Sequence, residues 1–185
     1  MARIQALLLS LLCLIFLQVS DVLASPAQTP LLQTSGNGSR ASNGDVTSYL
    51  SAHNTVRAKH HAVALKWNNN LAAAAQKWAD KCVFKHSGGT LGPFGENLAA
   101  GAPASGYHIA NAVQSWANEA PQYDPKHPVP SHFTQMVWKA TTEVGCAVNT
   151  CSNIFPKIPG GAAYYVCEYY PQGNVIGHFP QNVEV

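Results

Sequence analysis

The chain has 185 residues, a net charge of +2, and 11% charged and 46% hydrophobic residues. This length fits one globular domain. The 11 Lys and Arg residues are scattered singly against 9 Asp and Glu residues. The sequence therefore lacks the basic stripe of a nucleic-acid-binding protein, and we expect no nucleic acid as a partner.

Residues 1–24 have the pattern of a secretory signal peptide. Arg3 supplies a positive charge, residues 6–19 form an apolar run, and a small-residue cleavage pattern ends at Ala24. Polar residues interrupt the run, which is also too short for a bilayer span. We therefore predict a secreted, extracellular protein without a transmembrane anchor, and we expect a monomer.

Residues 25–44 are rich in Ser, Thr, Gly, Asn and Pro, which predicts a disordered leader. The leader carries the glycosylation acceptor pattern Asn-Gly-Ser, with Asn37 as the modified residue. The folded domain is then predicted to be residues 45–185.

Four cysteines remain after removal of the signal peptide. An oxidising compartment favours two disulfides among them, and the sequence alone leaves three connectivities open. The four are Cys82, Cys146, Cys151 and Cys167.

Three helices are predicted in the first part of the domain. Asp45 caps a helix that ends near His60, and a second helix follows the asparagines at 68–70. A third is predicted over residues 105–119, where Pro121 ends it. His53 lies on the apolar face of the first helix, and we interpret it as a hydrogen-bonded core residue.

Strands are predicted over residues 133–138, 144–148 and 163–169, which are rich in β-branched and aromatic residues. Helices that precede strands, without strict alternation, indicate an α+β domain with an antiparallel sheet.

Four short segments combine metal-competent side chains with turn residues. None has the HExxH or CxxC spacing of a metal site, so each is a weak signal alone. They are residues 85–89 (KHSGG), 95–98 (GENL), 116–119 (WANE) and 131–135 (SHFTQ).

Taken in order, these segments and several others resemble the CAP superfamily of cysteine-rich secretory proteins, insect venom antigens and plant pathogenesis-related proteins of the first class. The resemblance covers residues 45–185, and residues 174–183 look most like the fungal secreted members. The shared segments are 53–57 (HNTVR), 65–67 (LKW), 78–79 (WA), Cys82 before 86–87 (HS), 95–98 (GENL), Trp116 with Glu119 and Tyr123, 132–138 (HFTQMVW), 144–146 (VGC) and 165–175 (YVCEYYPQGNV). Glu168 departs from the pattern, and we attach no function to it.

The resemblance implies an α-β-α sandwich and a cleft lined by two histidines and two glutamates. These are His86, Glu96, Glu119 and His132. Two imidazoles can bind a divalent cation such as zinc, with the carboxylates orienting them. The alternative is a hydrogen-bonded polar cluster without metal. The resemblance also implies the disulfides Cys82–Cys151 and Cys146–Cys167.

The resemblance further implies binding of sterols or related small hydrophobic ligands through the loop before His132, with Tyr123, Val129 and Phe133 as candidate ligand contacts. Fatty acids would bind instead in an apolar groove between the helices 46–59 and 105–119. We expect the loop to act separately from the four polar residues, and no enzymatic activity. For such a carrier we expect a role in defence or host interaction. The alternatives are a metal-dependent hydrolase or peptidase that uses the His/Glu cleft, and an effector protein read by a receptor.

Overall fold

The computed structural model describes residues 41–185. The predicted signal peptide, the leader up to residue 40 and Asn37 lie outside the described residues. Within the described part, no helix is long and apolar enough to cross a membrane.

Helix α1 (Asn43–Lys59) begins before the predicted cap. Ser42 is the N-cap, because its hydroxyl accepts a hydrogen bond from the Asp45 N–H (3.2 Å) while the Asp45 carboxylate accepts one from the Ser42 N–H (3.0 Å). The last residues of the predicted leader therefore belong to the cap and first turn of α1, which corrects the leader boundary at residue 44.

The second predicted helix is present and has a side-chain cap, whereas the third is divided. Helix α2 (Asn69–Ala79) begins where predicted, with Asn68 as its N-cap. The third predicted helix is wrong as one element, because extended backbone at Tyr107 and His108 divides it. The structure has a 3₁₀ turn η1 (Ala104–Gly106), helix α3 (Ile109–Ala117) and a second 3₁₀ turn η2 (Ala120–Gln122).

The strand predicted over residues 133–138 is also wrong, since His132–Val137 form helix α4. Ser131 caps this helix by accepting from the Thr134 N–H (3.1 Å). The Glu119 carboxylate accepts from the free N–H groups of His132 (2.8 Å) and Phe133 (3.3 Å). Local capping and tertiary contact thus override the β-propensity of the segment. A short helix α5 (Phe179–Asn182) ends the fold.

Four strands form one sheet in the order β1-β3-β4-β2, namely β1 (Lys66–Trp67), β2 (Gly95–Gly101), β3 (Glu143–Cys151) and β4 (Ala162–Tyr170). The three long strands are antiparallel as predicted, whereas β1 runs parallel to β3. The edge strand β2 was not predicted, because its small residues carry no β-branched signal.

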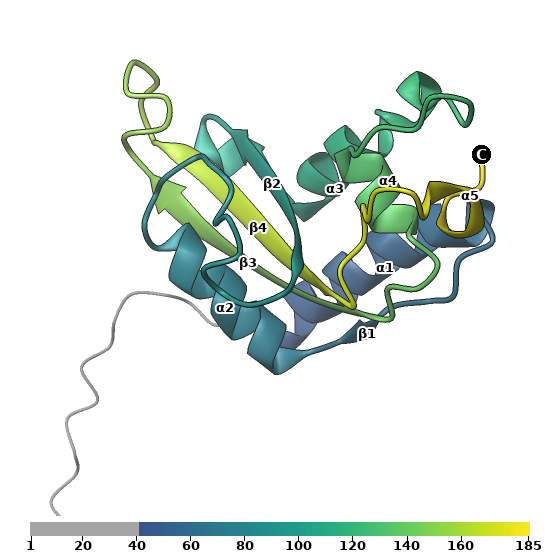
Figure 1. Cartoon of the computed structure of the whole chain (residues 1–185). Helices are drawn as coiled ribbons and strands as arrows, with labels where there is room; N and C mark the ends of the chain where they lie inside the picture. Colours follow the sequence, from purple (N-terminus) through teal and green to yellow (C-terminus); the bar gives the residue numbers. More distant parts are fainter. Residues whose placement is uncertain (1–40) are drawn as a thin grey trace, which may run out of the picture. The chain divides into compact units, whose positions relative to one another are not determined.

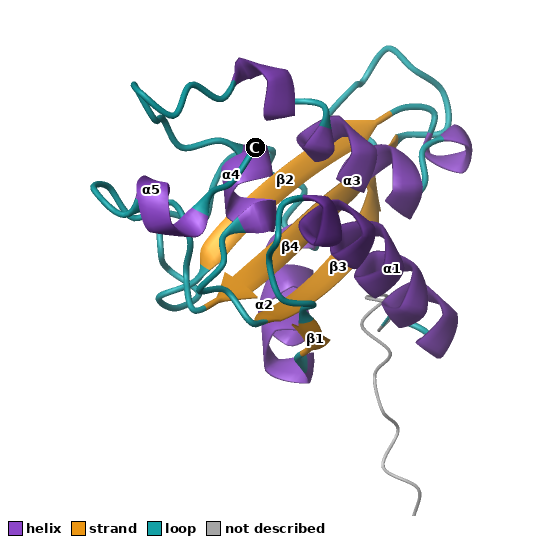
Figure 2. Ribbon diagram, turned by 90° about the vertical axis from the view of Figure 1, so that its right-hand side faces the viewer, coloured by secondary structure: helices purple, strands orange, loops and turns teal. Residues whose placement is uncertain are grey.

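Helices cover both faces of the sheet, as Figures 1 and 2 show. Helix α2 packs on one face around Ala75 and Ala79, and α1, α3 and α4 pack on the other around Trp116 and Phe133. This arrangement confirms the predicted α+β sandwich. The Cys82–Cys151 disulfide joins the end of α2 to β3, and Cys146–Cys167 joins β3 to β4, which is the pairing that the resemblance implied.

We predict that replacing both Cys82 and Cys151 by Ala lowers the free energy of unfolding by about 4 kcal/mol, because this bridge closes the long loop between residues 69 positions apart. Urea unfolding monitored by circular dichroism would measure the loss. Cys146 and Cys167 are only 21 positions apart, so the matched double Ala variant should lose less. The reverse ranking would contradict the prediction.

Candidate functional site

His86 and Glu96 form the first of two histidine–carboxylate pairs. His86 lies in the loop between α2 and β2, and its Nδ1 is 2.7 Å from the Glu96 Oε1. The Ser87 N–H donates to the same oxygen (2.9 Å). The hydrogen bond to Glu96 raises the pKa of His86 above its usual value. Burial works to raise the pKa of Glu96, but the hydrogen bonds from His86 and Ser87 bring it below its usual value.

His132 and Glu119 form the second pair, at the N-terminus of α4. The His132 Nδ1 is 2.6 Å from the Glu119 Oε1. The other carboxylate oxygen accepts the backbone N–H of His132 at 2.8 Å. Glu119 therefore fixes the backbone and the ring of His132 together.

The two imidazole rings face each other across one cleft. Their centroids are 6.4 Å apart, with 28° between the ring planes, and Trp116 stacks on His132 at 6.3 Å. Because each Nδ1 is engaged by a carboxylate, the Nε2 atom of each ring is left for a ligand. The four residues implied by the resemblance thus come together as two oriented imidazoles.

The pleat of edge strand β2 explains how the pairs meet. Leu98 packs on the α2 side of the sheet and Ala99 on the α1 and α3 side. Since side chains alternate along a strand, Glu96 shares the side of Leu98 and Asn97 the side of Ala99. Glu96 holds His86 on one side, while the Asn97 amide donates to the His132 carbonyl (3.0 Å) on the other.

Glu168 lies directly behind the first pair, on the strand next to β2. It is the register partner of Glu96 and is 1% exposed. Burial, followed by the charge of Glu96, raises the pKa of Glu168 to about 9. Glu96 Oε2 and Glu168 Oε1 are both buried without a hydrogen-bond partner, so a proton held by Glu168 would satisfy both. The sequence marked Glu168 as a departure from the family pattern, but only the strand register places it beside Glu96.

The predicted loop contacts divide into two kinds. Tyr123 and Val129 line a cavity of about 430 Å³, and Val129 is 60% exposed. Phe133 is fully buried and packs against Tyr123 (6.4 Å between ring centroids). This burial corrects its predicted role, because Phe133 supports the loop from the core instead of lining the cleft.

The same cavity contains all four polar residues. Its lining joins Tyr123, Val129 and Pro130 to His86, Glu96, Glu119 and His132. The expected separation between the loop and the polar cluster is therefore wrong. A ligand in this cleft would contact apolar side chains of the loop in one part of the cavity and the two imidazoles in another part.

The predicted fatty-acid groove is present between α1 and α3. It is a cavity of about 640 Å³. Apolar side chains from both helices line it, including Val56 and Val113, together with polar side chains of α1 such as Ser51 and Thr55. The groove is therefore partly apolar, with a polar rim on the α1 side.

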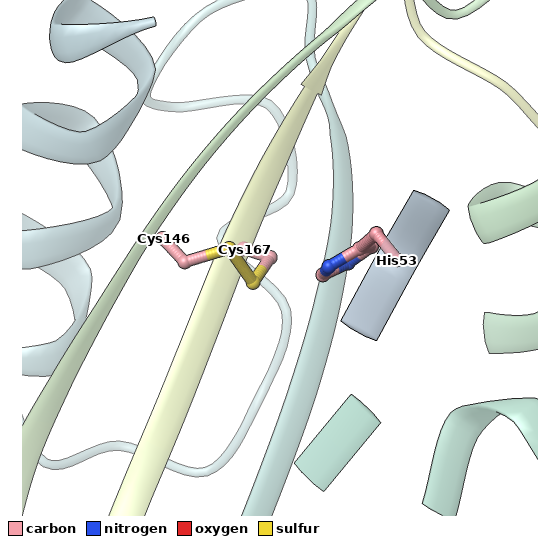
Figure 3. Close-up of side chains that lie close together, drawn as sticks. All are labelled: His53, Cys146 and Cys167. Carbon is pink, nitrogen blue, oxygen red and sulfur yellow. A yellow bond between two sulfur atoms is a disulfide. The ribbon is translucent and has the colours of Figure 1, made fainter. Parts of the chain in front are cut away.

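One buried cluster outside the cleft also brings metal-competent residue types together. His53, Cys146 and Cys167 place three candidate ligand atoms within 4.8 Å of one another (Figure 3). The two sulfur atoms are joined in a disulfide and are not thiolates. The His53 Nδ1 contacts the Tyr49 carbonyl (2.8 Å) and its Nε2 the Tyr169 hydroxyl (2.8 Å). His53 is therefore a hydrogen-bonded core residue, as predicted, and no ligand atom is free.

Comparison with known proteins agrees with this fold and site. Residues 50–169 match the CAP family, described as the Cysteine-rich secretory protein family, and the chain belongs to this family. It is 42% identical over 146 residues to protein PRY2 of Saccharomyces cerevisiae, covering 74% of this chain but only 40% of the yeast protein.

Two further relatives extend the comparison. The chain is 37% identical to fruiting body protein SC14 of Schizophyllum commune, covering 77% of this chain and 70% of that protein. The solved structure of NaASP2 with Zn²⁺ is similar with a TM-score of 0.60 at 25% identity, covering 75% of this chain and 85% of that chain.

We predict that Glu168→Gln raises the free energy of unfolding at pH 8 relative to the parent. The folded-state pKa of about 9 lies above the usual 4.5, so this group's contribution to stability is complete below pH 4.5 and is lost as the pH rises toward 9. A neutral amide does not lose its proton, and we expect a gain on the order of 1–3 kcal/mol at pH 8.

Urea unfolding at pH 5 and pH 8 would test this prediction, with Glu143→Gln on β3 as the matched control. The Glu168→Gln advantage should shrink or vanish at pH 5. The same difference from the parent at both pH values would contradict a protonated Glu168.

Proposed function

We propose that this protein is secreted and binds and carries sterols or related small hydrophobic ligands in the cleft between the histidine pairs and the Tyr123–Val129 loop. The observation that carries the proposal is the shared cavity of about 430 Å³, in which apolar loop residues and oriented imidazoles line one space. A sterol has this polarity, since a large apolar body ends in one hydroxyl. Burying the apolar body supplies the affinity, and the polar end fixes the orientation.

We further propose that a divalent cation binds in the polar part of the cleft. The two imidazoles with carboxylate-bound Nδ1 atoms would supply two of the four ligands that zinc prefers, and orienting carboxylates increase the basicity of such ligands. His86 and His132 would hold the metal, while Glu96 and Glu119 would orient them. A bound cation would supply a Lewis-acidic partner for an oxygen of the ligand. NaASP2, a structural relative, has been solved with Zn²⁺.

The hydrolase alternative has less support from the geometry. A metal-dependent hydrolase needs a carboxylate that is free to accept a proton from water. Here Glu96 and Glu119 are each bonded to a histidine and to backbone N–H groups. Ser87 is mostly buried, so the serine next to His86 does not present a nucleophile. No contact in the cleft favours the effector alternative.

We predict that Val129→Asp lowers sterol affinity at least about tenfold, because the ligand would then bury a carboxylate without a partner. Val129 is 60% exposed in this loop, so the variant should fold normally. Binding of radiolabelled sterol to the purified protein would measure the effect. Val63→Asp, a matched change at another exposed valine (71%), should bind as the parent does.

The competing location is the groove between α1 and α3. If the groove is the site, Ala52→Asp would abolish sterol binding and Val129→Asp would not. Equal sterol affinity of the Val129→Asp protein and the parent would contradict the proposal that the loop contacts the ligand.

We predict that replacing both His86 and His132 by Ala abolishes zinc binding, because the two remaining carboxylates make a poor site for zinc. Glu119→Gln should weaken zinc binding about 10- to 100-fold by loosening the orientation of His132. Titration calorimetry with zinc chloride would test both variants. The control is the double Ala variant of His108 and His178, two exposed histidines elsewhere. Unchanged zinc stoichiometry in the His86 and His132 variant would place the metal elsewhere.

A further inference from the structure

Two apolar segments are exposed together at one end of the sheet. Val83 and Phe84 follow α2, and Ile158 lies in the loop between β3 and β4; their exposed fractions are 42%, 49% and 42%. The Cys82–Cys151 disulfide joins the two segments, and Figure 1 shows them on the same side of the molecule. We call residues 81–85 and 152–161 the hairpin tip.

Side chains from within and beside the hairpin tip hold the backbone of residues 82–85. The carbonyl groups of Cys82, Val83 and Lys85 each accept a hydrogen bond from a side chain. The donors, in the same order, are Asn153 Nδ2 (2.9 Å), the Tyr164 hydroxyl (3.0 Å) and Trp78 Nε1 (2.7 Å). These three carbonyl groups are thus satisfied, while Val83, Phe84 and Ile158 remain about half exposed. Entry of these side chains into an apolar medium would cost little desolvation or ordering of the backbone.

The charged side chains within the hairpin tip are all amines, although the exposed Asp80 directly precedes it. Lys81, Lys85 and Lys157 belong to it, and the segments 81–95 and 144–167 contain no Asp or Glu. None of the three lysines takes part in an ion pair within the described part of the chain. This local excess stands out in a chain whose net charge is only +2.

We propose that the hairpin tip docks on an anionic lipid surface. Val83, Phe84 and Ile158 would enter the boundary between headgroups and acyl chains, and the three lysines would face anionic headgroups. Exposed apolar side chains surrounded by amines fit a lipid surface better than a soluble polyanion, since a polyanion uses the charges alone. This docking does not depend on which ligand the cleft carries.

Co-sedimentation with sterol-free phosphatidylcholine vesicles, with and without phosphatidylserine, tests the proposal. The parent protein should bind the vesicles that contain phosphatidylserine, and less at high salt. Lys85→Gln and Lys157→Gln should each weaken this binding about fivefold, and Phe84→Ser should weaken it as well. Val63→Ser and Lys66→Gln are matched controls at exposed positions near β1 and should bind as the parent does.

Three outcomes would overturn the proposal: no binding to the anionic vesicles, equal losses in the tip and control variants, or full binding by Phe84→Ser, which would indicate recognition by charge alone. Sterol binding by Phe84→Ser in solution should equal that of the parent. The vesicle assay can therefore fail without affecting the proposed carrier function, and the carrier function can fail without affecting the vesicle assay.

Discussion

A chain of buried hydrogen bonds through the core sets the position of the cleft. His53 on α1 contacts the Tyr169 hydroxyl on β4 (2.8 Å), and the Asn97 amide on β2 contacts both that hydroxyl (3.2 Å) and the His132 carbonyl (3.0 Å). Burial, together with the nearby charge of Arg57, lowers the pKa of His53 to about 4, so the ring is neutral and can accept from Tyr169. The first helix thereby determines where a cleft histidine lies.

Arg57 lies one turn further along α1 and fixes the C-terminal end of helix α4, which begins at His132. Its guanidinium is fully buried and donates to the carbonyls of Met136 (2.7 Å), Trp138 (3.0 Å) and Thr141 (2.8 Å). Burial lowers the pKa of Arg57 to about 10, so the group stays charged at neutral pH with carbonyl dipoles as its partners. Such hydrogen bonds to a charged group are strong, so α1 holds the C-terminal end of α4 directly and its N-terminal end through Tyr169 and Asn97.

These contacts explain which predictions from the sequence succeeded. The helices at residues 43–59 and 69–79 follow from periodicity and capping, which act locally. Helix α4 was missed although Ser131 caps it locally, because its first two N–H groups are satisfied by Glu119, which lies 13 residues before His132. The pairing of Glu96 with Glu168 depends on the register of β2 and β4. Local patterns contain neither kind of information, whereas the family motifs brought the four cleft residues together.

The loop side of the cleft is ordered by its own packing and by prolines. Tyr123 packs between Phe133 (6.4 Å) and Phe179 (6.5 Å), so its ring is fixed by the core and by α5. Four prolines between residues 121 and 130 restrict the backbone that follows. A wall ordered in this way loses little conformational entropy when a ligand binds, so more of the apolar contact energy appears as affinity. The polar wall is ordered by the carboxylates, and both walls are therefore rigid for different physical reasons.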